Sequence, residues 1–299
     1  MQTVGELLAA MMDRAASSTG RQSYSAIAEE SDGMTLLDLE ARRAERYNRE
    51  RGDLNPAEYD CPKCLNRGHT AETFERNGMV YTAYPECDCM GIRRSLWRLK
   101  KSGLEKAVRA QTFKAFRAVT DWQRQMVDVA KRYLNDPSGA KSGAWLYIGG
   151  AVGCGKTHIC TAVAGQLMIR EKLELRYVTW PGDSARIKAV ANDAEQYSAL
   201  VEPLKTVPVL YIDDFFKPVK DGFGAVKPPT AADIKLAYEI VNQRYINRAP
   251  TIISAERYLS ELEDIDMAVA SRIAERSRGY CLSIGRDRAK NYRYGGDAP

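Results

Sequence analysis

The residues with the clearest chemical signature are Gly150 to Thr157, which follow the pattern GxxxxGKT. Glycines let the backbone fold around a phosphate chain and direct successive N–H groups toward it. The ammonium group of Lys156 supplies a positive charge for the β- and γ-phosphates, and the Thr157 hydroxyl is a ligand for Mg²⁺. Because an apolar strand precedes this loop and a helix-forming segment follows it, the pattern predicts a nucleotide-binding P-loop and not a chance glycine turn.

Two side chains of this loop have other expected roles. Cys154 occupies a variable position of the motif, where we expect a small packed side chain and not a redox switch. His158 follows the motif and is expected to be a packed residue of the helix. The predicted nucleotide-contacting set is Gly150, Gly153, Cys154, Gly155, Lys156, Thr157 and His158.

A pair of carboxylates follows a second apolar run, residues 207–212. A nearly continuous apolar run is typical of a buried parallel strand, so these acids should lie at the carboxyl end of the sheet. Asp213 is placed to hold Mg²⁺, directly or through water, and Asp214 to orient and polarise an attacking water molecule. A lone aspartate there could be a helix cap or a turn residue, but after a P-loop the pair predicts an ATPase.

Four cysteines follow the pattern C-x2-C-x22-C-x-C, at Cys61, Cys64, Cys87 and Cys89. A cytosolic chain keeps its thiols reduced, so clustered cysteines indicate a metal and not disulfides. Four thiolates joined by a small hairpin predict a closed tetrahedral site for structural Zn²⁺, and the metal would stabilise a module too small to fold unaided. The alternatives are unliganded thiols, His69 in place of one cysteine, or an iron–sulfur cluster.

Composition narrows the class of protein. The 299 residues are 44% hydrophobic, which is enough for a real core and for about two structural units. No apolar run approaches the length of a membrane span, and the N-terminus lacks the pattern of a secretory signal. The sequence therefore predicts a cytoplasmic protein with no membrane contact. The formal net charge of +5 is modest, so its distribution matters more than its size.

The N-terminal third carries amphipathic and basic stretches. The spacing of apolar residues predicts helices over residues 2–17 and 35–50. The apolar face of each helix either packs on this chain or docks a partner. Residues 93–117 hold many arginines and lysines around Trp97 against the single acid Glu105. Such a run is either a solvated face or a contact for nucleic acid or an acidic partner.

From residue 121 onward strands and helices alternate, which predicts an α/β fold with a parallel three-layer sheet and the nucleotide at the carboxyl ends of its strands. The expected strands are 144–148, 175–180, 207–212, 251–254 and 280–284. The expected helices are 121–135, 156–170, 183–204, 231–247 and 266–277.

In this order the motifs resemble the DnaC/DnaI type of replicative helicase loader, a clade of AAA+ ATPases. The resemblance runs from Tyr59 onward. It includes both cysteine pairs and the stretches 101–104, 112–116, 155–158, 212–214, 242–245, 250–256, 271–276, 285–288 and 291–293.

The resemblance implies roles for further residues. Ser254 is the expected sensor of the γ-phosphate, and Arg272 or Arg276 the arginine finger that reaches a neighbouring subunit's ATP. Arg288 or Arg293 would be the second sensor. Surface ion pairs are the alternative for these arginines. Two positions depart from the family pattern: Asp214 stands where a glutamate is more common, and Ala255-Glu256 where many relatives have Ser-Asn.

The resemblance also implies an organisation and partners. The expected parts are N-terminal docking helices (1–55), a four-cysteine zinc-binding module (56–92), a basic helical linker (93–120) and an AAA+ ATPase domain (121–299). The partners would be a hexameric replicative DNA helicase, single-stranded DNA and further copies of the chain in an ATP-dependent homo-oligomer. Phe215, Phe216 and Phe223 are candidates for stacking on bases, although all three could be core or interface residues.

Three other functions compete with this interpretation. An IstB-like transposition helper ATPase would act on duplex DNA, but such relatives generally lack the cysteine module. A small-molecule P-loop kinase would not need the late arginine cluster. An origin-binding initiator is disfavoured because the chain ends soon after Arg293, so we expect no C-terminal helix-turn-helix domain.

Overall fold

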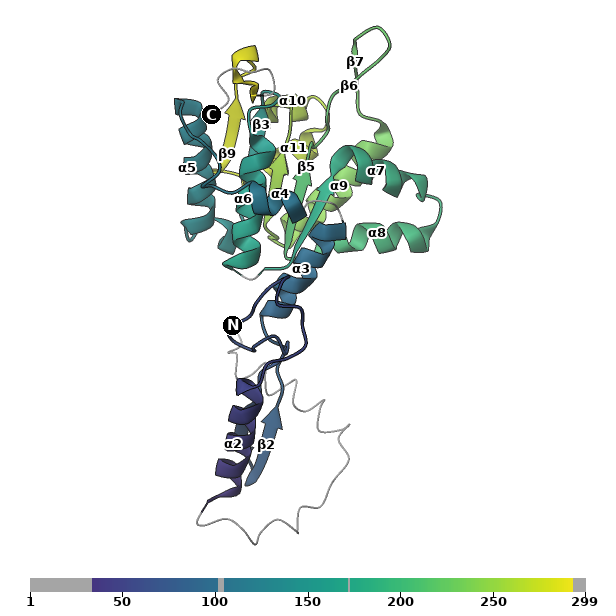
Figure 1. The fold of residues 1–299 in the computed structure, drawn as a ribbon. Helices are drawn as coiled ribbons and strands as arrows, with labels where there is room; N and C mark the ends of the chain where they lie inside the picture. Colours follow the sequence, from purple (N-terminus) through teal and green to yellow (C-terminus); the bar gives the residue numbers. More distant parts are fainter. Residues whose placement is uncertain (1–33, 102–104, 172, 293–299) are drawn as a thin grey trace. The chain divides into compact units, whose positions relative to one another are not determined.

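The computed structural model describes residues 34–101, 105–171 and 173–292 (Figure 1). The helix expected over residues 2–17 lies outside the described residues, and so does Arg293. Contacts divide the chain into two compact units. One unit takes the described residues up to Glu50 together with Thr70–Pro85, and the other takes Arg51–His69 and the residues from Glu86 onward.

In the first unit a helix packs on a β-hairpin. Helix α2 (Leu36–Arg49) begins at a capping box in which the Thr35 hydroxyl accepts a hydrogen bond from the Asp38 N–H. Strands β1 (Glu72–Arg76) and β2 (Met79–Ala83) pair antiparallel through the turn at Asn77-Gly78, where both residues have positive φ. The side-chain amide of Asn48 joins helix to hairpin, because it donates to Ala71 O and accepts from Ala71 N. The expected helix over residues 35–50 is therefore confirmed.

The second unit contains a five-stranded sheet in which every neighbouring pair of strands is parallel. The strand order is β4-β5-β8-β3-β9. The bounds are β3 (Trp145–Gly150), β4 (Leu175–Thr179), β5 (Val209–Asp213), β8 (Thr251–Ser254) and β9 (Cys281–Ile284). The three central strands are buried along their whole length, which explains why they are nearly continuous apolar runs in the sequence.

Helices cover both faces of this sheet. Alternate residues of β3 point to opposite faces, so Leu146 and Ile148 enter one core and Trp145 and Tyr147 the other. The first core also takes buried residues of α5 (Asp121–Asn135) and α6 (Lys156–Ile169), and the second takes those of α9 (Ala231–Ile246) and α11 (Met267–Arg276). The predicted three-layer α/β fold is confirmed.

The remaining elements connect these layers. They are α3 (Cys89–Lys101), α4 (Glu105–Ala110), η1 (Ala140–Ser142), α7 (Trp180–Ala189), α8 (Ala194–Thr206), β6 (Val219–Lys220), β7 (Val226–Lys227), α10 (Leu259–Glu263) and η2 (Arg288–Lys290). None of the described helices combines the length and the apolar character that a membrane crossing requires.

The element boundaries differ from expectation at three places. The single helix expected over 183–204 is two helices, because the Asp193 side chain accepts from Gln196 N and starts α8 anew. The short helix α10 was not expected. Between the expected strand 207–212 and the expected helix 231–247, where no strand was expected, lies the β6–β7 hairpin, whose strands are too short to give an alternating pattern.

Candidate nucleotide site and cysteine cluster

The P-loop joins the carboxyl end of β3 to the first turn of α6. Gly150, Gly153 and Gly155 all have positive φ, a backbone conformation that residues other than glycine rarely adopt. The ammonium group of Lys156 is buried and donates to Gly150 O at 3.0 Å and Ala151 O at 2.6 Å, both within its own loop. The loop and Lys156 therefore form one hydrogen-bonded ring beside the positive end of α6.

Asp213 is the hub of the site. Its buried carboxylate accepts from the Thr157 hydroxyl at 3.1 Å and from the Tyr177 hydroxyl at 3.1 Å. The Ser254 hydroxyl donates to the same oxygen that Thr157 contacts. Burial, together with the neighbouring charge of Asp213, raises the pKa of the Tyr177 phenol, so Tyr177 remains a hydrogen-bond donor at neutral pH. The P-loop, the end of β5 and the end of β8 thus meet at one carboxylate.

Asp214 lies in the left-handed region of the backbone, with φ of 54°. Its carboxylate is 2.7 Å from the ammonium group of Lys217, which also lies 3.5 Å from Glu256. Partial burial disfavours the charge of Lys217, but its hydrogen bond and ion pair with Asp214 outweigh this and raise its pKa. Lys217 is therefore charged at neutral pH and holds the second acid of the strand-end pair.

A cavity of about 500 Å³ opens above these residues, a size typical of sites for small ligands. Its charged and hydroxyl-bearing lining residues include Lys156, Thr157, Asp213, Asp214, Lys217 and Glu256. Gln111, Phe116, Arg117 and Tyr292 also line it: the ring of Phe116 covers Gly155, and Tyr292 N donates to Gly153 O. The cavity therefore combines charged groups that suit phosphates with aromatic rings beside the P-loop.

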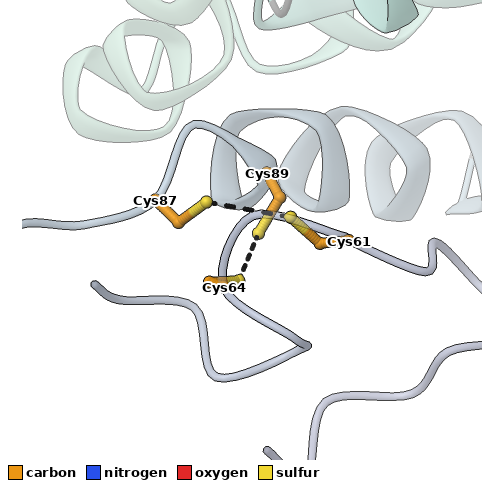
Figure 2. Close-up of side chains that lie close together, drawn as sticks. All are labelled: Cys61, Cys64, Cys87 and Cys89. Carbon is orange, nitrogen blue, oxygen red and sulfur yellow. Dashed lines mark hydrogen bonds between the residues drawn. The ribbon is translucent and has the colours of Figure 1, made fainter. Parts of the chain in front are cut away.

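The four predicted zinc ligands converge (Figure 2). All four Sγ atoms lie within 4.8 Å of one another and are buried. The Sγ atoms of Cys61 and Cys87 are 3.8 Å apart and those of Cys64 and Cys89 3.5 Å, close to the spacing of about 3.8 Å that Zn–S bonds of about 2.3 Å require in a tetrahedron. His69 is exposed and is not part of this group. The donor set fits structural Zn²⁺, which these four cysteines would hold.

The arrangement of the cysteines depends on buried polar contacts. The Gly68 N–H donates to Cys64 Sγ at 3.3 Å. The guanidinium group of Arg93 donates to Asn55 O, Tyr59 O and the Asn66 side chain, and that side chain accepts in turn from Cys61 N. Loop and helix are thus tied together around the thiols, and such contacts orient the ligands of a metal site.

No protein-family model matches the chain. The XkdC protein of the phage-like element PBSX of Bacillus subtilis strain 168 is 31% identical over 241 residues, which are 78% of this chain and 85% of XkdC. The chain belongs to the XkdC family. The uncharacterized protein YqaM of the same strain is 26% identical over 283 residues, 80% of this chain and 87% of YqaM.

Solved structures resemble this XkdC-family protein more distantly. The DnaC helicase loader aligns with a TM-score of 0.48 and 18% identity over 60% of this chain and 98% of that chain. DnaI aligns with a TM-score of 0.48 and 22% identity over 60% of this chain and 92% of that chain. The GxxxxGKT loop, the strand-end acids and the parallel sheet of the XkdC-family protein are those of a P-loop NTPase fold.

The structure of the XkdC-family protein brings only part of the predicted site set together. Lys156, Thr157, Asp213, Asp214 and His158 line the cavity, and Ser254 reaches it through Asp213. The ring of His158 packs edge-on against Phe116, so it is a packed residue as expected. Cys154 is fully buried, and burial raises the pKa of its thiol. This agrees with a packing role, because a protonated thiol is a poor nucleophile.

Three of the predicted arginines fall within the described residues, and none of the three lines the cavity. Arg272 donates to Asn242 and Ala268 O and lies over the Tyr238 ring, and Arg276 donates to Tyr245 O. Both are on α11. Arg288 lies in η2. In this XkdC-family chain the two guanidinium groups of α11 are thus held by the helix and by α9, away from the cavity.

Several residues of the site were missed by sequence reasoning. Lys217, Tyr177, Gln111 and Tyr292 belong to no motif of the P-loop or the strand-end acids, and only the fold brings them to the cavity or to Asp213. Of the three phenylalanines considered for base stacking, Phe215 and Phe216 are buried in the second core, which rules out that role. Phe223 is 99% exposed.

Proposed function

We propose that this protein is an ATP-dependent replicative helicase loader, which binds ATP with Mg²⁺, single-stranded DNA and a hexameric DNA helicase. The observation that carries the ATPase part is the convergence of the Thr157 and Ser254 hydroxyls on the Asp213 carboxylate. It links the phosphate loop, the strand-end acid and the expected γ-phosphate sensor. The order of the motifs, which resembles that of DnaC/DnaI-type helicase loaders, supports the replication role.

Each residue of the site then has a defined part in hydrolysis. Lys156 would leave the loop carbonyls and bind the β- and γ-phosphates, because their charge is a stronger partner than a neutral carbonyl. Thr157 and Asp213 would hold Mg²⁺, which neutralises charge on the phosphates when it is bound. Asp214 orients and deprotonates the attacking water, and Ser254 senses whether the γ-phosphate is present.

The arginines are proposed to act between subunits. Arg272 and Arg276 lie on α11 and do not line the cavity of their own chain, so either would act as an arginine finger only on the ATP of a neighbouring copy. The proposed state is therefore an ATP-dependent homo-oligomer in which the next subunit completes the site. Arg288, in η2, remains the proposed second sensor.

The proposed organisation assigns partner contacts to different parts of the chain. The N-terminal docking segment (1–55) and the zinc module (56–92) would bind the helicase, and the linker (93–120) would join them to the ATPase domain (121–299). A direct test mixes the full chain with candidate replicative helicases, with ATP or without it, and measures co-elution. We expect ATP-dependent capture that Lys156→Ala abolishes; absence of capture of the helicase of the same host would reject the loader role and leave the ATPase.

A second candidate is an IstB-like transposition helper that acts on duplex DNA. The fully assembled cysteine cluster argues against it, because such relatives generally lack this module. Assembly on duplex DNA without preference for single strands would favour the second candidate.

A further inference from the structure

The β6–β7 hairpin begins at Val219, a few residues after the strand-end acids Asp213 and Asp214. Val219 pairs with Lys227 and Lys220 with Val226. Asp221 shapes the tip, because its carboxylate accepts from Phe223 N and Ala225 N, both at 2.9 Å. Figure 1 shows the hairpin extending away from the rest of its unit. A two-stranded hairpin has little stability of its own, so this turn chemistry keeps a defined tip in place.

The tip presents a single aromatic ring to solvent. Phe223 is 99% exposed and stands between Gly222 and Gly224. A Cβ added at either glycine would meet no atom within 4 Å. Because neither neighbour has a side chain, both faces of the ring are open to a flat partner.

The sides of the hairpin carry positive charge. Residues directly opposite each other in an antiparallel pair share a face, so each face presents one lysine and one valine. Lys220 and Lys227 are exposed. Asp221 is the one acid in the sequence from Lys217 to Lys227, and its carboxylate is engaged by the backbone of the tip.

We propose that this hairpin is the contact for single-stranded nucleic acid, with Phe223 stacking on an unpaired base while Lys220 and Lys227 contact phosphates. The inference rests on the proposed function, because it names the site at which that function engages its DNA. An open ring between cations matches the stacking and backbone contacts by which proteins hold single strands. Duplex DNA offers no free base face, and a protein-binding hot spot would need an apolar surround that the two glycines do not supply.

The base of the hairpin is connected to the nucleotide site. Lys217 stands two residues before β6 and is bound to Asp214 and Glu256, all three of which line the cavity. A γ-phosphate in that cavity adds negative charge beside Lys217 and competes for its ammonium group. Because only Pro218 separates Lys217 from β6, a shift of Lys217 is passed to the hairpin. DNA affinity should therefore depend on the bound nucleotide.

The test measures fluorescence anisotropy of a labelled thymidine oligomer with the full chain, in the presence of a non-hydrolysable ATP analogue or ADP. Phe223→Ala should weaken binding by about 5- to 100-fold. Phe223→Trp should retain binding, and its fluorescence should be quenched on binding, which a merely structural residue would not produce. Replacing Lys220 and Lys227 by Gln should reduce the salt dependence of the affinity by about 0.7 in log–log slope for each lysine. Lys131→Gln, an exposed lysine on α5, is the matched control.

The outcomes separate this inference from the proposed function. ATP hydrolysis without DNA should be unchanged in the hairpin variants, which shows that they fold. If the wild-type chain binds the oligomer and Phe223→Ala binds it equally well, the hairpin is not the contact, although DNA binding stands. If Phe223→Ala loses helicase capture but keeps the oligomer, the hairpin is a protein contact and the inference is wrong. If the wild-type chain binds no single-stranded DNA in any nucleotide state, both the proposed DNA binding and the proposed role of the hairpin are wrong.

Discussion

The ammonium group of Lys217 lies 2.7 Å from the carboxylate of Asp214 and forms an ion pair with it. Asp214 is the acid proposed to activate water. A water molecule that approaches this carboxylate would have to compete with the ammonium group of Lys217 for its oxygen atoms. Lys217 also approaches Glu256 at 3.5 Å, so it can exchange one acid for the other. We therefore predict that this ion pair slows the proposed ATP hydrolysis until Lys217 moves.

Lys217→Met should raise the basal rate of ATP hydrolysis, by about threefold to tenfold, since a loss of about 1 kcal/mol of pairing changes a rate by about fivefold. Nucleotide affinity should change little. Steady-state phosphate release at saturating ATP measures the effect. Lys235→Met, on α9, is the control. A rate at or below the wild-type value would mean that Lys217 assists the reaction and does not restrain it.

Gln111 is predicted to read the nucleobase. Its side-chain oxygen is buried and lacks a hydrogen-bond partner within the part of the chain that the structure describes. The hydroxyl of Tyr292, which lines the same cavity, is also buried and has no partner among the described residues. A buried acceptor without a donor costs about 1–3 kcal/mol, which the exocyclic amine of adenine would recover and the carbonyl of guanine would not. Gln111→Met should reduce the preference for ATP over GTP by about 5- to 100-fold.

Competition between fluorescent ATP and unlabelled nucleotides measures that preference. Thr112→Ser, at a neighbouring exposed position, should leave it unchanged. If Gln111→Met keeps the wild-type ratio of ATP to GTP affinity, Gln111 does not contact the base.

Most of the fold could be predicted from the sequence because its central strands are buried on both faces. Strand β5 reads as one apolar run ending in acids, and the P-loop helix starts at a recognised motif. The break between α7 and α8 was harder to predict. It depends on one residue, Asp193, whose side chain caps α8 instead of continuing the preceding helix. The hairpin at β6 and β7 is stabilised by a turn and not by hydrophobic alternation.

The candidate site was predictable where one motif carries one function. Thr157 and Asp213 stand in separate motifs, and the geometry of parallel strands brings them together. Lys217 and Gln111 could not be found in the same way, because a lysine in a loop and a glutamine at a helix end carry no signal of their own. Their positions depend on the long-range packing that folds residues 111–117 against the P-loop.

Asp233 is predicted to stabilise the ATPase unit in a pH-dependent manner. Burial opposes its charge, but hydrogen bonds from Lys188 and Thr230 outweigh it and lower its pKa. A lowered folded-state pKa gives stability that is present above the unfolded pKa and is lost as pH falls through the folded value. Asp233→Asn should therefore lower the free energy of unfolding by about 1 kcal/mol at pH 7, and the difference should vanish in acid below the usual range of aspartate.

Urea denaturation of both proteins at neutral and acid pH checks this expectation. Asp128→Asn, at an exposed position of α5, is the matched control and should have little effect at either pH. An equal loss at both pH values would show that the carboxylate acts through its shape and not through its charge.

Removal of metal should act on the cysteine loops before it acts on nucleotide binding. Cys89 is the first residue of α3, and the same helix carries Ile92 into the core and Ser95 Oγ to the N–H of Leu175. None of the four cysteines lines the nucleotide cavity. We expect one zinc ion per chain by elemental analysis, and its removal should lower the melting temperature while ATP affinity stays within about threefold.

Cys64→Ser should reproduce the effect of chelation, whereas Cys281→Ser, outside the cluster, should not. Full retention of stability after complete loss of metal would show that the thiols need no ion.

Asp214 is predicted to be both the carboxylate that activates water and the residue best suited to its backbone. Its φ of 54° lies in the left-handed region, which aspartate tolerates better than glutamate because its short side chain bonds locally. This explains an aspartate where a glutamate is more common. Asp214→Asn keeps the shape and the backbone preference but removes the base, so it should bind ATP normally and hydrolyse it at least about 100-fold more slowly.

Asp214→Glu separates reach from backbone strain. The longer side chain should support hydrolysis, while the left-handed backbone makes the variant less stable by about 1 kcal/mol. Single-turnover hydrolysis and thermal unfolding of the same preparations give both quantities. Hydrolysis by Asp214→Asn at the wild-type rate would remove Asp214 from the mechanism. The water would then have to be activated by Glu256, the other acid that contacts Lys217 and lines the cavity.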